Sequence, residues 1–129
     1  MKYLKTKKIF ENQSKEISAL LNDINVNNIK GIQEYIDKGY DLDYKDEDGD
    51  FALIYATLNY IINISDGPNN SKGEFSTIEF LIDAGANWNI KDNDNKTFCD
   101  YLEDKDKEKL KDKYPDKYGQ YISSKLGLL

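Results

Sequence analysis

Two stretches of this chain, Ile29–Asp46 and Phe75–Asp92, follow one pattern when they are aligned with a shift of 46 residues. Their apolar positions recur at i, i+3, i+6 and i+7, which places them on one face of a helix. The aligned pairs are Ile29 with Phe75, Ile32 with Ile78, Tyr35 with Leu81 and Ile36 with Ile82. This internal repeat predicts units that stack, because one unit alone cannot bury its apolar face.

The residues after each predicted helix indicate a sharp stop and then a turn. Gly39 and Gly85 end the two helices, since a residue without a Cβ atom adopts the left-handed cap conformation at little cost. Asp and Asn then alternate with apolar residues, as in a short extended segment, and they can hold a tight turn through backbone hydrogen bonds. The same shift aligns Asp-Gly at 48–49 with Asp-Asn at 94–95, and both pairs are turn signals.

The segments DKGYDLDYKDEDGDF and DAGANWNIKDNDNKT resemble the joint of an ankyrin repeat, in which a helix ends in a G-A-D-x-N-like loop before D-x-x-G-x-T-P-L-H. The resemblance covers roughly residues 28–102 and departs from the family in two ways. The Thr-Pro-Leu-His motif is replaced by Phe-Ala-Leu-Ile at 51–54 and Thr-Phe-Cys-Asp at 97–100, and the chain has no His. The spacing of 46 also exceeds the ankyrin period of about 33, which implies an insertion of about 13 residues between Ile61 and Glu74.

The resemblance implies an all-α, ankyrin-like helical solenoid with short hairpin loops. About three repeats would span roughly residues 14–114, with the outer ones acting as caps. We expect one domain over residues 1–129, with a leader at 1–13, an inserted loop at 65–74 and a C-terminal cap or tail at 115–129. A first helix is marked by Ile17, Leu20, Leu21 and Ile24, and Asn28 is a candidate N-cap. Further helices are expected at Ile29–Lys38, Phe51–Ile64, Phe75–Ala84 and Asp104–Lys113.

Charge is distributed unevenly along the chain. The net charge is −6, from 24 acidic residues and 18 lysines. Residues 16–104 hold 19 acids against six lysines, whereas both ends of the chain are basic. Such a field disfavours nucleic acid and favours a basic protein partner, mainly through the association rate.

The residue inventory argues against an enzyme and against a membrane protein. The chain has no His, no Gly-rich phosphate loop and no zinc-ligand spacing, so we expect no catalytic residues and no cofactor. The single cysteine, Cys99, aligns with the core Leu of the family and is expected to be a buried thiol. It also fits a reducing compartment, and the lack of a signal peptide or long apolar run favours the cytoplasm.

The acidic run at residues 46–50 looks a little like a calcium loop. If Gly49 is placed at the sixth position of such a loop, Tyr44 and Tyr55 fall at the first and twelfth positions, where Asp and Glu are needed. We therefore expect a solvated hairpin tip and no metal.

Ankyrin-like proteins bind partners with hairpin tips and with the exposed face of the first helix of each repeat. Carried onto this chain, the tips are Asp43–Asp50 and Lys91–Lys96. Tyr55 and Tyr101 are expected to be exposed, whereas Tyr35 and Trp88 are expected to pack. The predicted partner-binding residues are Asp43, Asp46, Glu47, Asp48, Asp50, Tyr55, Asn59, Lys91, Asp92, Asp94 and Tyr101.

The leading hypothesis is a non-catalytic protein–protein interaction module that is monomeric when free. In this reading it is a small acidic inhibitor, similar to an immunity or antitoxin protein, that binds and blocks a basic protein toxin; a nuclease is one candidate. The alternative is an ankyrin adaptor or effector that recruits a host or cellular protein through the tyrosines or the 65–74 loop.

Overall fold

A computed structural model describes residues 16–66 and 74–127, and every regular element in these ranges is helical, with no β-strand. This confirms the all-α expectation. A first helix covers residues 16–25. The later elements are α2 (Ile29–Asp37), α3 (Ala52–Asp66), α4 (Phe75–Asp83), the 3₁₀ helix η1 (Phe98–Tyr101), α5 (Asp104–Lys113) and α6 (Pro115–Lys125).

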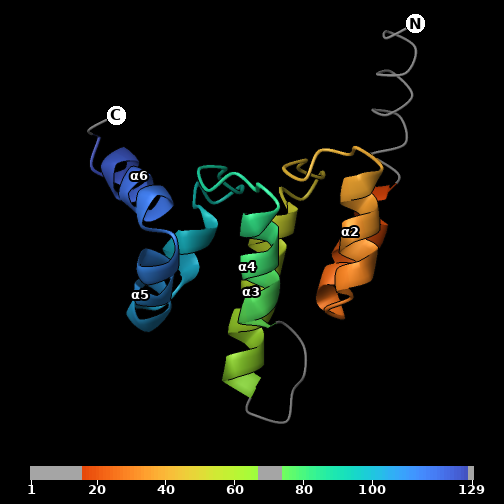
Figure 1. Cartoon of the computed structure of the whole chain (residues 1–129), viewed down its shortest axis with the longest axis horizontal. Helices are drawn as coiled ribbons and strands as arrows, with labels where there is room; N and C mark the ends of the chain where they lie inside the picture. Colours follow the sequence, from red (N-terminus) through yellow and green to blue (C-terminus); the bar gives the residue numbers. More distant parts are fainter. Residues whose placement is uncertain (1–15, 67–73, 128–129) are drawn as a thin grey trace, which may run out of the picture.

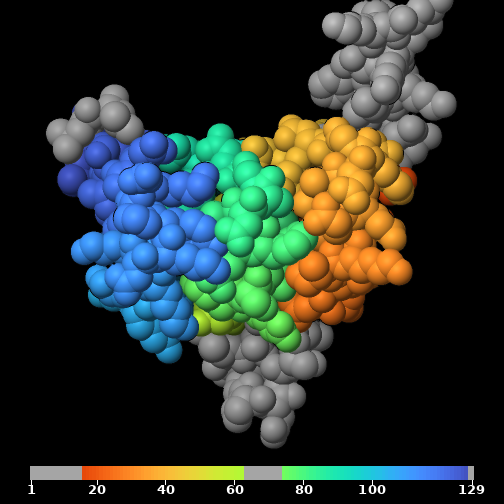
Figure 2. Space-filling view, viewed as in Figure 1, coloured from red at the N-terminus to blue at the C-terminus, as the bar shows by residue number. Residues whose placement is uncertain are grey.

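The helices stand in groups that follow one another across the molecule (Figure 1). The helix at 16–25 lies against α2, α3 packs on α4, and α5 packs on α6; η1 joins the last group to α3. In Figure 1 the loops after α2 and α4 lie along the same edge of this row. The space-filling view shows the groups packed side by side on this face (Figure 2).

One apolar core runs through all of these groups, and it is built largely from the faces that the sequence predicts. Ile29, which the pattern placed on the apolar face of α2, is 38% exposed at the start of that helix. The four residues that mark the first helix are buried, and Leu53, Ala56 and Thr57 of α3 are buried as well. The largest fully buried apolar side chains are Phe51, Phe98, Leu20, Ile24, Ile32, Leu53, Ile54, Ile78, Leu81, Ile82 and Leu110. Burial of this apolar surface is the main favourable term for the packing of these helices.

Trp88 and Cys99 occupy the buried positions expected of them. The Trp88 side chain is only 5% exposed, and its ring stands edge-on to Phe98 with centroids 5.1 Å apart and to Tyr114 at 6.2 Å. Trp88 therefore joins the loop after α4 to the elements that follow. Cys99 is fully buried, and this burial raises the pKa of its thiol to about 11, so little thiolate forms at neutral pH.

Helix ends agree with the expected positions to within two residues. Asn28 caps α2, because its side-chain oxygen accepts the N–H of Gly31 at 3.3 Å. Helix α3 continues to Asp66, past the expected start of the inserted loop; residues 67–73 of that loop and the leader at 1–13 lie outside the described residues. The C-terminal segment forms a full helix, α6, with Pro115 in its first turn.

The sequence pattern predicted short extended segments after α2 and α4, and this prediction is wrong. The side chains of Asp41 and Asn87 each accept the backbone N–H two residues ahead, at 2.9 Å. Such Asx turns bend the chain locally, so side-chain capping of the backbone outweighs the alternation of apolar and polar residues.

The next turns, which we call the first turn (Asp46–Asp50) and the second turn (Asp92–Lys96), have the same hydrogen bonds. In each, the first and last residues are joined by a backbone N–H···O bond of 2.9 Å, and the first residue's side chain accepts two backbone N–H groups. Gly49 and Asn95 both have positive φ, at 82° and 62°. The shift of 46 residues therefore relates two equivalent turns.

We expect Gly49→Ala to destabilise the protein by about 1–2 kcal/mol, because a side chain at positive φ is strained. A Cβ atom at this position would also lie 2.5 Å from Asn93. Gly119→Ala, in the interior of α6 with open space around it, is the matched control and should stabilise by about 0.5–1 kcal/mol. Urea denaturation of both variants measures this; equal effects would contradict the turn geometry.

Asp100 attaches α6 to the rest of the molecule. Its carboxylate accepts hydrogen bonds from the Tyr121 hydroxyl and the Lys125 ammonium, both at 2.7 Å, and from the Thr97 N–H at 3.0 Å. Burial alone would raise the pKa of Asp100, but these hydrogen bonds and the Lys125 charge outweigh it and hold the pKa well below its ordinary value.

A carboxyl group with a lowered pKa stabilises the fold above its unfolded pKa of about 4 and loses this contribution as the pH falls further. Asp100→Asn should therefore cost about 1–3 kcal/mol at pH 7, with a difference from the wild type that shrinks below about pH 4. Denaturation curves at several pH values measure the difference. A difference that stayed constant down to low pH would contradict the assigned role of the charge.

Candidate functional site

The two turns lie side by side and are joined by contacts between residues far apart in the sequence. The Lys45 ammonium donates to the Lys91 carbonyl at 2.8 Å, and the Asn93 side-chain amide donates to the Asp48 carbonyl at 3.0 Å. Below the turns, the N–H of Asn87 donates to the Asp43 carboxylate at 2.9 Å. The predicted hairpin tips are therefore one continuous surface.

Three of the predicted binding residues hold this surface in shape. One carboxylate oxygen of Asp46 accepts the N–H groups of residues 48 and 50, and one of Asp92 accepts those of residues 94 and 96. The other oxygen of Asp92 accepts the Tyr101 hydroxyl. Asp43 accepts the Asn87 N–H, as described above. These oxygens are occupied by the protein itself, which limits what they can offer a partner.

The remaining acids of the first turn differ in exposure. Glu47 and Asp48 are exposed and Asp50 is partly buried. We call the four residues Asp46, Glu47, Asp48 and Asp50 the acidic cluster. Carboxylate oxygens of its three aspartates lie within 4.8 Å of one another.

The acidic cluster is uncompensated within the described part of the chain. The ion pairs found there lie elsewhere, at Glu79, Asp100, Glu103 and Asp106. Burial raises the pKa of Asp50, and the negative charges of Asp46, Asp48 and Asp92 raise it further. Like charges held this close repel one another, so a cation placed among them would lower the electrostatic free energy.

A hollow of about 310 Å³ adjoins the acidic cluster. Asp46, Glu47 and Asp48 line one side of the hollow. Tyr44 and Ile17 contribute apolar surface, and Ser18 also lines the hollow. The helix at 16–25 supplies Ile17, which the sequence pattern marked only as part of an amphipathic helix, and Ser18, which the pattern did not single out. Their place beside the acids depends on packing between distant segments, which periodicity does not reveal.

The predicted helix-face residues are less accessible than expected. Tyr55 is partly buried and packs against the core, and Asn59 is partly buried with a side-chain nitrogen that has no hydrogen-bond partner among the described residues. Tyr101 is also partly buried; its hydroxyl donates to Asp92, and the Lys96 ammonium lies 5.2 Å from its ring centroid. Asp94 and Lys91 are exposed on the second turn. Among the described residues, no side-chain hydrogen bond, ion pair or ring contact links Tyr55 or Asn59 to the two turns.

Proximity of three aspartates does not make the first turn a metal site. The second turn has the same hydrogen bonds although Lys96 stands where the first turn has Asp50. Asp46 and Asp92 accept equivalent backbone groups, so the turn geometry is explained without an ion.

In residues 16–66 and 74–127, no helix combines the length and apolar composition needed to cross a membrane. In comparisons with known proteins, no protein-family model, no curated protein and no solved structure matches the chain. The case for a function therefore depends on the geometry described above.

We expect substitution of Asp46 to lower the stability of the protein and substitution of the exposed Asp48 to leave it nearly unchanged. Asp46→Ala removes an acceptor for two backbone N–H groups and should destabilise by about 1–3 kcal/mol. Asp48→Ala, two residues away and exposed, should change stability by no more than about 0.5 kcal/mol. Thermal or urea unfolding compares the pair; a larger loss for Asp48→Ala would reverse the assignment.

Proposed function

We propose that this chain is an ankyrin-like helical solenoid that works as a non-catalytic protein-binding module, with the acidic cluster as the centre of its binding surface. The partner is a basic protein, and the chain acts as a small inhibitor, similar to an immunity or antitoxin protein, that blocks a basic toxin such as a nuclease. The observation that carries the proposal is the uncompensated charge of the acidic cluster beside a hollow with apolar surface.

The ankyrin-like part of the proposal is supported by the equivalence of the two turns. Both have the same hydrogen bonds, and both follow a helix that ends at a glycine with positive φ. The Lys45 ammonium also donates to the Lys91 carbonyl, and these two residues are aligned by the 46-residue shift. Stacked units with hairpin loops along one edge are the arrangement that the sequence resemblance implies.

The binding part of the proposal follows from the chemistry of the hollow. A Lys or Arg side chain has an apolar stem and a charged end. The stem could lie along Ile17 and Tyr44, while the charge reaches Asp46, Glu47 or Asp48. Such a contact relieves the repulsion among the carboxylates, and the surrounding negative field speeds association with a basic partner.

The adaptor alternative has less support from the described residues. It would use Tyr55, Tyr101 or the 65–74 loop, but both tyrosines are partly buried and residues 67–73 are outside the described ranges. No hydrogen bond, ion pair or ring contact among residues 16–66 and 74–127 favours it over the inhibitor.

The test is a binding experiment with variants that remove three charges and keep the Asp46 acceptor. The test variant carries Glu47→Gln, Asp48→Asn and Asp50→Asn. The matched control carries Glu108→Gln, Asp112→Asn and Asp116→Asn, which removes the same charges from exposed positions on α5 and α6. Each tagged protein is used to capture partners from a lysate of the source organism at low and high salt, and captured proteins are identified by mass spectrometry and purified for affinity measurement.

We expect one basic partner that binds wild type and control in a 1:1 complex at low salt and is released at high salt. The test variant should bind it about tenfold more weakly, since exposed ion pairs contribute up to about 1 kcal/mol each. Equal affinity and equal salt dependence for all three proteins would contradict the proposal. A salt-resistant partner that is lost instead on substitution of Tyr55 or Tyr101 would support the adaptor.

A further inference from the structure

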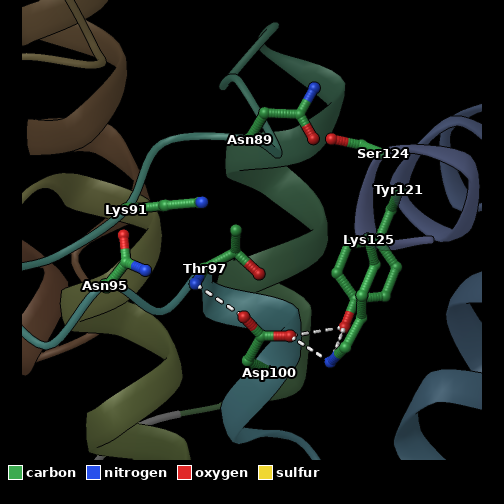
Figure 3. Close-up of a pocket in the computed structure, with 8 residues that line it drawn as sticks. All are labelled: Asn89, Lys91, Asn95, Thr97, Asp100, Tyr121, Ser124 and Lys125. Atoms are coloured by element: carbon green, nitrogen blue, oxygen red, sulfur yellow. Dashed lines mark hydrogen bonds and ion pairs between the residues drawn. The ribbon is translucent and has the colours of Figure 1, made fainter. Parts of the chain in front are cut away.

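A second pocket, of about 250 Å³, lies between the second turn and α6, away from the acidic cluster (Figure 3). Lys91, Asn95 and Thr97 line it on one side, and Ser124 and Lys125 of α6 line it on the other. Figure 3 shows these two sets of side chains facing each other across the space, with Asp100 between them. The pocket is polar and small.

The negative charge of Asp100, the acidic residue that lines this pocket, is already balanced by Lys125. Asp100 accepts hydrogen bonds from Tyr121, Lys125 and the Thr97 N–H, so both of its oxygens are occupied. Lys91 has no side-chain partner in the described part of the chain. The pocket therefore has a positive charge in excess, in a chain whose net charge is −6.

Hydrogen-bond donors are also in excess here. The side chains of Asn95 and Ser124 have no partner among the described residues. Thr97 is only 6% exposed, and its buried hydroxyl oxygen has no partner either. Thr97 is the N-cap of η1 and has a capping-box arrangement with Asp100, but the Asp100 N–H donates to the Thr97 carbonyl at 3.2 Å and the Thr97 hydroxyl makes no hydrogen bond of good geometry. A buried hydroxyl without a partner is uncommon and costs free energy, which a bound ligand would recover.

We propose that this pocket binds the phosphate group of a small molecule. Lys91 supplies the charge, and the hydroxyls of Thr97 and Ser124 with the amide of Asn95 donate hydrogen bonds from opposite sides of the pocket. A phosphate has acceptor oxygens in several directions, whereas a carboxylate presents two in one plane. Donors that converge from both sides therefore fit a phosphate better. The volume matches a small molecule. This inference does not depend on the function proposed for the acidic cluster.

The test is a titration of the full chain with inorganic phosphate, in which binding is monitored through backbone amide chemical shifts in ¹H–¹⁵N spectra. Ionic strength is held constant at about 0.15 M with sodium chloride, where the screening length is about 8 Å and distant acids contribute little. Sodium chloride alone, acetate and a short phosphoserine peptide are titrated in parallel.

The variants are Lys91→Gln, Thr97→Val and Thr97→Ser. Lys111→Gln, on the exposed surface of α5, removes the same charge outside the pocket and is the control. Thr97→Val also has a readout of its own: since the hydroxyl is unpartnered in the free protein, the variant should be at least as stable as the wild type while it loses phosphate binding.

We expect saturable shifts at Asn95, Thr97 and Ser124 with phosphate, weaker ones with acetate and none with chloride. Lys91→Gln and Thr97→Val should weaken binding about tenfold, whereas Thr97→Ser and Lys111→Gln should keep it. No saturable response, an equal response to chloride, or wild-type binding by Lys91→Gln would overturn the proposal. Acetate binding as tight as phosphate would overturn the phosphate preference, and tighter binding of the peptide would overturn the small-molecule class.

Discussion

One carboxylate oxygen organises each turn, and the arrangement of the whole molecule depends on these two oxygens. Asp46 and Asp92 each accept two backbone N–H groups that would otherwise need water, which fixes the path of the chain between one helix and the next. Because the two turns have the same shape, Asn93 reaches the Asp48 carbonyl and Lys45 reaches the Lys91 carbonyl. The turns then stack at a fixed shift, and the helices that follow them bury their apolar faces against each other.

The same residue type has two different uses on this surface. Aspartates at the start of each turn satisfy the backbone, whereas Glu47, Asp48 and Asp94 point to solvent. Holding the first group in place also holds the second group close together, so the fold itself concentrates negative charge at the first turn. Like-charge repulsion is a cost to the isolated protein, and it is relieved when a cationic partner binds. We regard this link between turn structure and charge density as the physical basis of the proposed binding.

The sequence predicted α2 to α5, most of the core and the two turns at 46–50 and 92–96, because these depend on local patterns. Periodicity identified the buried faces of α2 and α4, and the Asn28 cap, the buried Trp88 and the glycines after the two helices followed from residue type. The prediction of extended segments after α2 and α4 was wrong, because the side chains of Asp41 and Asn87 bend the backbone there. The hollow beside Ile17 and the bond from Tyr101 to Asp92 could not be predicted, since each depends on side chains brought together only by tertiary packing. The full length of α6 was missed because a Gly-containing C-terminal tail gives a weak helix signal.

The stacking of the two turn regions is the central claim, and hydrogen exchange at one amide tests it directly. Asn87 is exposed, and its N–H donates to the Asp43 carboxylate of the preceding unit. The account predicts that this amide exchanges much more slowly than an unstructured one, and that Asp43→Ala removes the protection while neighbouring helices keep theirs. Exchange of the Asn87 amide at the rate of a free peptide in the wild-type protein would contradict the stacked arrangement.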